Sequence, residues 1–259
     1  MEWIDTHSHL YDGTFQEDMD QVIQDCKDAG LSRIYLPNVD LESLDALHAL
    51  SEKDPGLFFP MMGLHPTSVK ADWKTVLAEI KEQLYARPEY YVAVGEIGTD
   101  LYWDKTFERE MEICFREQAA WAADLNKPII IHSRDSLDWN IGIVEELKSK
   151  YPNLTGIFHC FNGTEEQALR IQKLGFLIGI GGVVTFKNAG VAEALTNVPL
   201  DIMVMETDAP YLAPVPYRGK RNHSMYIPLI AQKLAEVKDC SLNEIARITT
   251  KNALTLFGT

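Results

Sequence analysis

Two histidines near the start of the chain, His7 and His9, are separated by a single residue within an apolar stretch, Ile4–Leu10. If that stretch is a strand, residues i and i+2 point to the same side and the two imidazoles lie next to each other. Paired imidazole nitrogens are good ligands for borderline-soft divalent cations such as Zn²⁺. By itself the pair would fit two polar residues near a strand end equally well. It predicts a metal site only if further ligands converge on it.

Further ligating side chains follow other apolar stretches of the chain. These are Glu96, His132, His159 and Asp208, each at the end of a different stretch. Four histidines and two carboxylates exceed the three protein ligands that a mononuclear hydrolytic zinc site usually has. We therefore expect two divalent ions. In this scheme His7, His9 and Asp208 bind one ion, His132 and His159 bind the other, and Glu96 bridges both.

Such a pair of ions acidifies water and favours hydrolysis, with Asp208 as ligand, proton acceptor or both, and Glu96 as the second catalytic carboxylate. Two other side chains fit an anionic substrate. His65 follows the third apolar stretch, and Arg134 lies two residues after His132, on the same side of an extended chain. A guanidinium binds phosphate through two parallel hydrogen bonds. The structural alternatives are a pair between Arg134 and a nearby carboxylate, and a capping or core role for His65.

The stretches that carry these residues alternate with amphipathic ones. The eight expected strands lie near Ile4–Leu10, Arg33–Val39, Leu57–Leu64, Tyr91–Ile97, Pro128–His132, Gly156–Phe161, Phe176–Gly181 and Ile202–Glu206. Helices are expected at 16–29, 41–52, 72–86, 107–125, 141–150, 165–174, 189–195, 225–237 and 242–257. This pattern predicts an α/β protein, a single (β/α)8 TIM barrel, with its functional residues at the carboxyl ends of the strands. An open doubly wound sheet is the alternative, but no G-x-G-x-x-G motif follows the first strand.

Composition limits the class of protein. The 259 residues are 46% hydrophobic and 24% charged, which excludes a disordered chain, and we expect one domain spanning residues 1–259. The formal charge of −14 argues against broad binding to nucleic acid. Four scattered cysteines indicate reduced thiols. No apolar run is long enough to span a bilayer and no signal peptide is evident, so we expect a cytoplasmic protein, a monomer without membrane contact.

The motifs as a set resemble the TatD-type deoxyribonuclease family, metal-dependent hydrolases with amidohydrolase-like barrels. They are His7-Ser8-His9-Leu10, Gly63-Leu64-His65-Pro66, Gly95-Glu96-Ile97-Gly98, His132-Ser133-Arg134-Asp135, His159-Cys160-Phe161-Asn162-Gly163, Glu206-Thr207-Asp208-Ala209-Pro210-Tyr211-Leu212 and Arg218-Gly219-Lys220-Arg221-Asn222. They occur in the family's order from residue 4 to beyond residue 222.

The resemblance implies a divalent-metal deoxyribonuclease that works as an exonuclease from 3′ ends. It implies the same six metal ligands as above, and His65 and Arg134 as contacts to the substrate phosphate. Two positions depart from the family: His223-Ser224 stands where Glu-Pro is usual, and Thr99 where Leu is usual. The first departure lies in the loop after the eighth strand, where it bears on substrate selection or on the start of the next helix.

That loop is the densest basic stretch, and we expect Arg218 and Arg221 to contact substrate there, although Arg218 would also fit a brace to backbone carbonyls. The expected substrate is single-stranded DNA. The expected cofactors are two divalent ions: histidine ligands favour Zn²⁺ or Mn²⁺, whereas the resemblance implies activity with Mg²⁺. The same ligands could also serve an amidohydrolase acting on an amide, a lactone or a ring C–N bond. A neutral substrate, however, would not need the cations His65 and Arg134.

Overall fold

Eight short parallel strands line the inside of the molecule, whose computed structural model describes residues 1–258. The strands are β1 (Trp3–Asp5), β2 (Leu31–Pro37), β3 (Phe58–Met61), β4 (Val94–Asp100), β5 (Ile129–Arg134), β6 (Gly156–Phe158), β7 (Leu177–Ile180) and β8 (Met203–Met205). Each overlaps one of the eight stretches expected from the sequence. Pairing is parallel and sequential, in the orders β1-β2-β3 and β4-β5-β6-β7-β8.

Backbone hydrogen bonds close these two sheets into a barrel. Between β3 and β4, the N–H of Met62 donates to Ala93 and the N–H of Gly95 donates to Met62, over 3.2 and 2.9 Å. Between β8 and β1, the N–H of Thr6 donates to the carbonyl of Met205 over 3.0 Å. The predicted (β/α)8 barrel is therefore confirmed.

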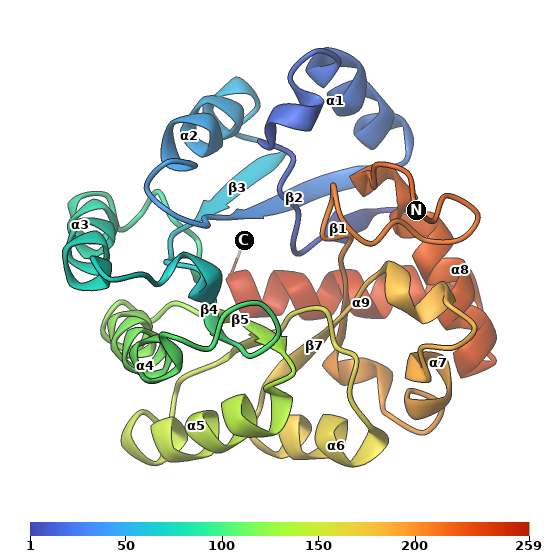
Figure 1. The fold of residues 1–259 in the computed structure, drawn as a ribbon. Helices are drawn as coiled ribbons and strands as arrows, with labels where there is room; N and C mark the ends of the chain where they lie inside the picture. Colours follow the sequence, from blue (N-terminus) through green and yellow to red (C-terminus); the bar gives the residue numbers. More distant parts are fainter. Residues whose placement is uncertain (259) are drawn as a thin grey trace.

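Helices surround the strands, as Figure 1 shows in a view along the barrel. The α-helices are α1 (Met19–Asp28), α2 (Leu44–Lys53), α3 (Trp73–Ala86), α4 (Glu108–Asp124), α5 (Leu137–Lys150), α6 (Glu165–Lys173), α7 (Val191–Ala194), α8 (Ile227–Lys238) and α9 (Leu242–Phe257). Short 3₁₀ turns are η1 (Gly13–Phe15), η2 (Pro66–Ser68), η3 (Gly182–Thr185), η4 (Leu200–Ile202) and η5 (Ser224–Tyr226). Among the helices, the largest difference from the expected bounds is at α5, which begins four residues earlier.

Alternation along each strand divides its side chains between two apolar layers. In β5, Ile130 points into the barrel, where it packs with Ile4, Ile157 and Val204, whereas Ile129 and Ile131 pack in the layer beneath the helices. Because both faces of each strand are buried, the strands consist almost entirely of apolar residues. The barrel interior is thus filled by side chains, and a site must lie at one of its ends.

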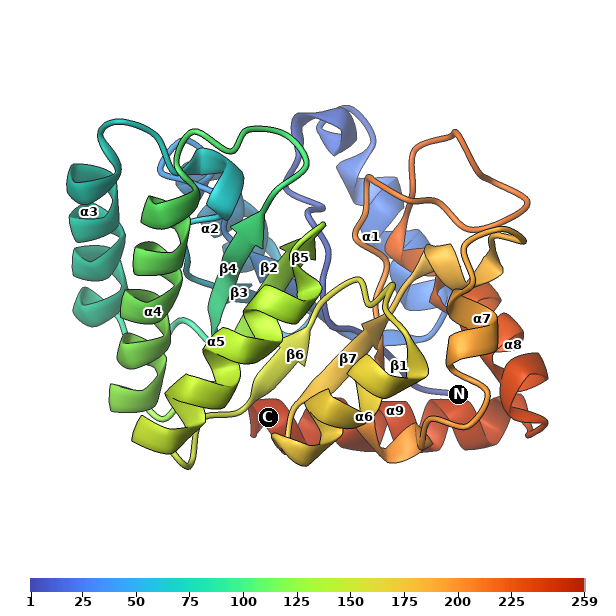
Figure 2. The same ribbon diagram turned by 60° about the horizontal axis from the view of Figure 1, so that its bottom comes forward.

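Helix α9 covers the end of the barrel at which the strands begin (Figure 2). There the ring of Phe257 stacks on Tyr35, with centroids 3.8 Å apart. The arrowheads of the strands point to the opposite end, where the loops after each strand meet. Among residues 1–258, no helix is long and apolar enough to cross a membrane. The open end near the loops is where the polar side chains gather.

Candidate metal centre

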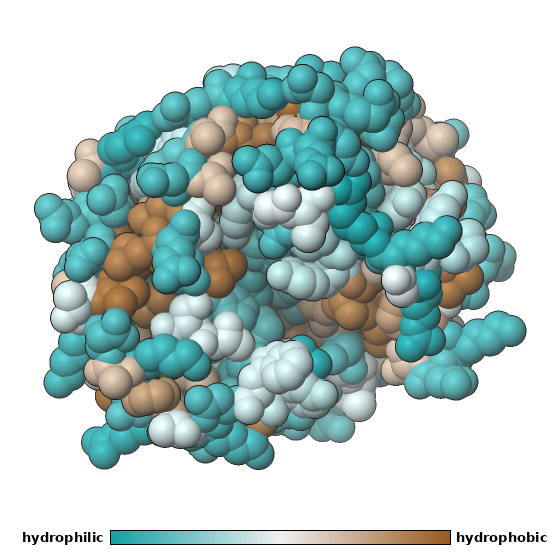
Figure 3. All heavy atoms as spheres, turned by 45° about the horizontal axis from the view of Figure 1, so that its top comes forward, coloured by the Kyte–Doolittle hydropathy of each residue, from teal (hydrophilic) through white to brown (hydrophobic). Residues whose placement is uncertain are grey.

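Five of the six expected ligands line a cleft at the carboxyl ends of the strands, and the sixth, His7, is buried in contact with them. The cleft has a volume of about 850 Å³, and Figure 3 shows it as a hollow in this face of the molecule. His7 and His9 follow β1, Glu96 lies within β4, His132 lies within β5, and His159 and Asp208 follow β6 and β8. His7, His9, Glu96 and His159 are buried, and the side chain of Asp208 is 15% exposed.

The two histidines after β1 face each other and two carboxylates. Nε2 of His7 lies 3.2 Å from Nε2 of His9. Oε2 of Glu96 lies 3.1 and 3.6 Å from these two nitrogens, and Oδ1 of Asp208 lies 3.7 and 3.5 Å from them. The spacing expected from an H-x-H pair in extended chain is therefore present, and both imidazoles contribute to one group of four ligating atoms.

Glu96 connects this group to a second one. Its other oxygen, Oε1, lies 2.9 Å from Nδ1 of His132, 3.5 Å from Nε2 of His65 and 3.8 Å from Nε2 of His159. Burial alone would raise the pKa of Glu96, but the surrounding histidines hold that pKa well below its ordinary value. An ionised carboxylate whose two oxygens face different histidines has the arrangement that a bridging ligand needs.

For His9, His159 and His132, a partner on one ring nitrogen determines which nitrogen faces the other ligands. The hydroxyl of Tyr11 donates to the carbonyl of Pro37 over 2.6 Å, so it must accept the proton of His9 Nδ1, 2.8 Å away. Nε2 of a neutral His9 is then an unprotonated nitrogen facing the two carboxylates. Histidines that ligate metals usually donate their second nitrogen to such a partner.

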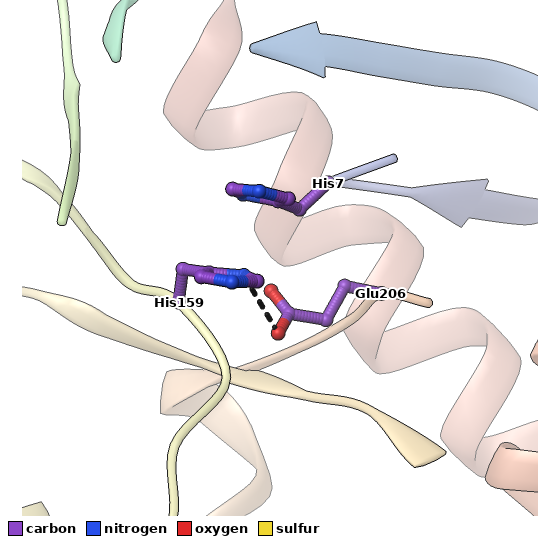
Figure 4. A group of neighbouring side chains, drawn as sticks. All are labelled: His7, His159 and Glu206. Atoms are coloured by element: carbon purple, nitrogen blue, oxygen red, sulfur yellow. Dashed lines mark ion pairs between the residues drawn. The ribbon is translucent and has the colours of Figure 1, made fainter. Parts of the chain in front are cut away.

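His159 is held in the same way, by Glu206. Nδ1 of His159 forms an ion pair with Oε1 of Glu206 over 3.0 Å, and its ring stacks on that of His7 at 3.5 Å between centroids (Figure 4). Burial disfavours the charged imidazolium, but Glu206, Glu96 and Asp208 outweigh it and raise the pKa of His159 to about 9. Burial and the neighbouring His159 instead lower the pKa of His7. A cation among these residues would replace the proton on Nε2 of His159.

His132 and His65 use their nitrogens differently. Nε2 of His132 lies 2.8 Å from Oδ2 of Asp100, which leaves Nδ1 toward Glu96. In His65, Nδ1 accepts the N–H of Thr67 over 3.1 Å, so the neutral ring carries its proton on Nε2. His65 therefore carries an N–H donor on Nε2, which lies 3.2 Å from Nδ1 of His132. This supports the expected contact to substrate more than a role as ligand, although His65 lies close to Glu96 and His132.

The donor set fits divalent cations. Within residues 1–258, three groups of side chains have their ligand atoms close enough together to hold an ion. They are His7 with His9 and Glu96, His7 with His159 and Glu206, and His65 with Glu96 and His132. Glu96, Asp208, Asp100 and Glu206 bring four carboxylates into or beside the buried centre. Buried carboxylates need compensating charge, and two divalent ions would carry the same amount of positive charge.

The expected substrate cations lie in three different environments. Arg134 is exposed and lines the cleft, and its guanidinium lies over the ring of Tyr102 at 3.9 Å. Within residues 1–258 it forms no ion pair with a carboxylate, because Asp100 is occupied by His132 and by backbone amides. Arg221 instead pairs with Asp18, and Arg218 lies over Phe186 at 4.5 Å. Neither of these two lines the cleft, so their contact with substrate stays a prediction without support from this geometry.

The residues that depart from the family start the helix after β8. Nδ1 of His223 accepts the N–H of Met225 over 3.0 Å at the beginning of η5, and the hydroxyl of Ser224 donates to Ser8 over 3.1 Å. Sequence reasoning missed the roles of Asp100 and Glu206. Their spacing carried a signal, since Asp100 is four residues after Glu96 and Glu206 is two before Asp208, which places each pair on one side of an extended chain.

Comparisons with known proteins agree with the fold and with a metal-dependent hydrolase. The family described as TatD related DNase matches residues 4–258. An uncharacterized metal-dependent hydrolase of Bacillus subtilis, YabD, is 38% identical over 98% of both chains. The 3'-5' ssDNA/RNA exonuclease TatD of Pantoea vagans is 32% identical over 94% of both chains. The crystal structure of YjjV, a TatD homolog from Escherichia coli, superposes with a TM-score of 0.92 at 29% identity, covering 99% of this chain and 98% of the other.

We expect Glu96→Gln to reduce the metal content of the purified protein from two equivalents to one or none, because the amide presents only one ligating oxygen and no charge. Elemental analysis after dialysis against each ion measures this directly. Retention of two equivalents at unchanged affinity would show that Glu96 does not bridge.

Glu206→Gln should weaken metal binding by roughly 10–100-fold. The neutral amide holds the Nδ1 side of His159 less strongly than the carboxylate does, so the ring is less firmly oriented and Nε2 is a weaker ligand. Competition with a chromogenic chelator gives the affinity, and thermal melting of the metal-free protein separates a folding defect from a binding defect. Glu166→Gln, an exposed change on α6, is the matched control. Equal affinities for the two variants would contradict the role given to Glu206.

Proposed function

Because the chain belongs to the TatD-related DNase family of metal-dependent hydrolases, we propose that it hydrolyses phosphodiester bonds of single-stranded DNA. The observation that carries the proposal is the division of Glu96 between two sets of histidines. One oxygen faces His7 and His9, and the other faces His132. A two-ion centre is a frequent solution for cleaving phosphate esters, because both the attacking and the leaving oxygen can be stabilised.

In this proposal, His7, His9 and Asp208 hold one ion, His132 and His159 hold the other, and Glu96 belongs to both. When bound, the ions supply Lewis-acid polarisation of the phosphate and lower the pKa of water. Imidazole ligands favour Zn²⁺ or Mn²⁺, whereas the carboxylates also suit Mg²⁺. The choice among these three ions is therefore left to measurement of activity with each.

Asp208 is the proposed proton acceptor. Burial alone would raise the pKa of Asp208, but His159, His9 and His7 lower it, so the carboxylate is ionised at neutral pH. Its side chain is more exposed to the cleft than that of Glu96, at 15% against 2%. Asp208 can thus reach an attacking water, while Glu96 stays fixed among the histidines.

Two donors on the rim would neutralise the phosphate. His65 offers its Nε2–H, and Arg134 offers a guanidinium that no carboxylate of residues 1–258 occupies. Donors that are aimed in advance at developing negative charge stabilise the transition state. An amidohydrolase acting on a neutral amide, lactone or ring C–N bond could use the same carboxylates and histidines, but it gives no reason for this free guanidinium.

The proposed direction of cleavage rests on the similarity to TatD of Pantoea vagans. Its name describes a 3'-5' exonuclease acting on ssDNA and RNA. We propose that this chain also removes nucleotides from 3′ ends. Its formal charge of −14 means that the bound cations and Arg134, more than the overall surface, would attract the strand.

The test uses single-stranded DNA labelled at the 5′ end, with metal-free protein supplied with each divalent ion in turn. We expect a ladder that shortens from the 3′ end, and Asp208→Asn should lower kcat by roughly 10²–10⁴-fold, since it removes the proton acceptor. Metal content is measured in parallel, to separate loss of the base from loss of an ion. Turnover within a few-fold of the parent at saturating metal would exclude Asp208 as the base.

Arg134→Ala should lower kcat/KM on the oligonucleotide by roughly 10–150-fold, the equivalent of about 1.5–3 kcal/mol for a charge-assisted hydrogen bond. Arg134→Lys should recover only part of this loss, because a point charge cannot make a bidentate contact. Arg247→Ala, an exposed change on α9 at the other end of the barrel, is the control. Unchanged turnover on DNA, or far better cleavage of a neutral amide or lactone, would contradict the nuclease proposal.

A further inference from the structure

Two aromatic side chains stand largely in water beside the metal centre. Tyr102 and Trp103 lie in the loop between β4 and α4, and they are 53% and 68% exposed. Trp103 lines the same cleft as Glu96 and His132. Large aromatic side chains are normally buried for most of their area, so an exposed pair at a cleft rim needs an explanation other than core packing.

The backbone of this loop is fixed to the metal centre through one carboxylate. Oδ1 of Asp100 accepts the N–H groups of Tyr102 and Trp103, over 3.0 and 3.2 Å. Its other oxygen, Oδ2, holds Nε2 of His132 over 2.8 Å. The side chain of Asp100 is only 1% exposed, so this connection is shielded from water. Asp100 therefore fixes the backbone of both aromatic residues relative to His132, a proposed metal ligand.

Arg134 completes the arrangement. Its guanidinium lies 3.9 Å above the ring of Tyr102 and 5.1 Å from the ring of Trp103. The two rings meet edge to face, with centroids 4.9 Å apart and planes at 88°. Arg134 thus lies over both rings and closest to Tyr102, whereas Trp103, the more exposed of the two, keeps most of its surface in water at the cleft.

We propose that Trp103, supported by Tyr102 and Arg134, stacks on the base of the nucleotide next to the cleaved phosphodiester. The inference rests on the proposed nuclease function. Arg134 would contact the phosphate, and the adjacent indole would receive the base of that nucleotide. Every base presents a flat π surface, so such a contact accepts all four bases. A base inside a duplex already has both faces stacked, so an unpaired end is better suited to this contact.

The test compares a single-stranded oligonucleotide with the same strand lacking the bases of its two 3′-terminal nucleotides. Binding is measured by fluorescence anisotropy on versions with phosphorothioate 3′ linkages that resist cleavage, and kcat/KM is measured on normal linkages. Trp103→Ala should weaken both quantities by about 5–150-fold on the intact strand. Trp103→Phe should restore most of the loss. The abasic strand should bind the parent and Trp103→Ala equally, within about threefold, as expected when the partner group is absent.

Tyr85→Ala removes another exposed aromatic ring, on α3 and away from the cleft, and serves as the matched control. If Trp103→Ala weakens binding to the intact and abasic strands by the same factor, or to neither, the stacking proposal is wrong. If the parent cleaves no oligonucleotide with any ion, the nuclease proposal is wrong, and the anisotropy comparison still decides whether Trp103 binds a base.

Discussion

A buried carboxylate requires compensating positive charge, and the carboxylate of Glu96 is buried at the centre of the open end of the barrel. Its side chain is 2% exposed, and its oxygens face histidines from four different loops or strands. Without cations, imidazoles supply positive charge: Glu206, followed by Glu96 and Asp208, outweighs burial and raises the pKa of His159 to about 9. The arrangement is suited to exchange protons for divalent ions, because the same nitrogens serve both.

The contacts behind the imidazoles decide whether that exchange is possible. Tyr11 and Glu206 each hold the Nδ1 side of a histidine and leave Nε2 toward the cleft, whereas Asp100 holds the Nε2 side of His132. His65 is set the other way, with its proton on Nε2. Their backbone and side-chain partners would thus suit residues of one type to two proposed roles, with His9, His159 and His132 as acceptors for a cation and His65 as a donor to an anion.

The sequence predicts the barrel, because its strands and helices follow from local patterns, whereas Arg218 and Arg221, which were expected to contact substrate, do not line the cleft. Strands buried on both faces leave continuous apolar stretches. His7 and His9 lie within the first expected stretch but follow β1, and Asp208 follows the eighth stretch. The roles of Asp100, Glu206 and Arg221 were not predictable in the same way. Arg221 pairs with Asp18, which is 203 residues away in the sequence, and only the closed barrel brings the two together. The position of Arg134 over Tyr102 likewise depends on the side-chain rotamers of a loop whose sequence has no periodicity.

One end of the barrel contributes to stability through apolar packing, and the other carries the proposed metal ligands. At the closed end, Phe257 of α9 stacks on Tyr35 and continues the apolar interior. At the open end, Cys160 and Asp208 adopt positive φ angles of 48° and 58°, a conformation that costs about 1–2 kcal/mol for residues with a Cβ. Such strain persists only where the surroundings determine it. Here they do, because the N–H of Cys160 donates to Glu206 and the N–H of Asp208 donates to His7. The bonds that aim the proposed ligands are therefore the same bonds that hold the strained backbone, and the apolar barrel beneath them provides the stability on which both depend.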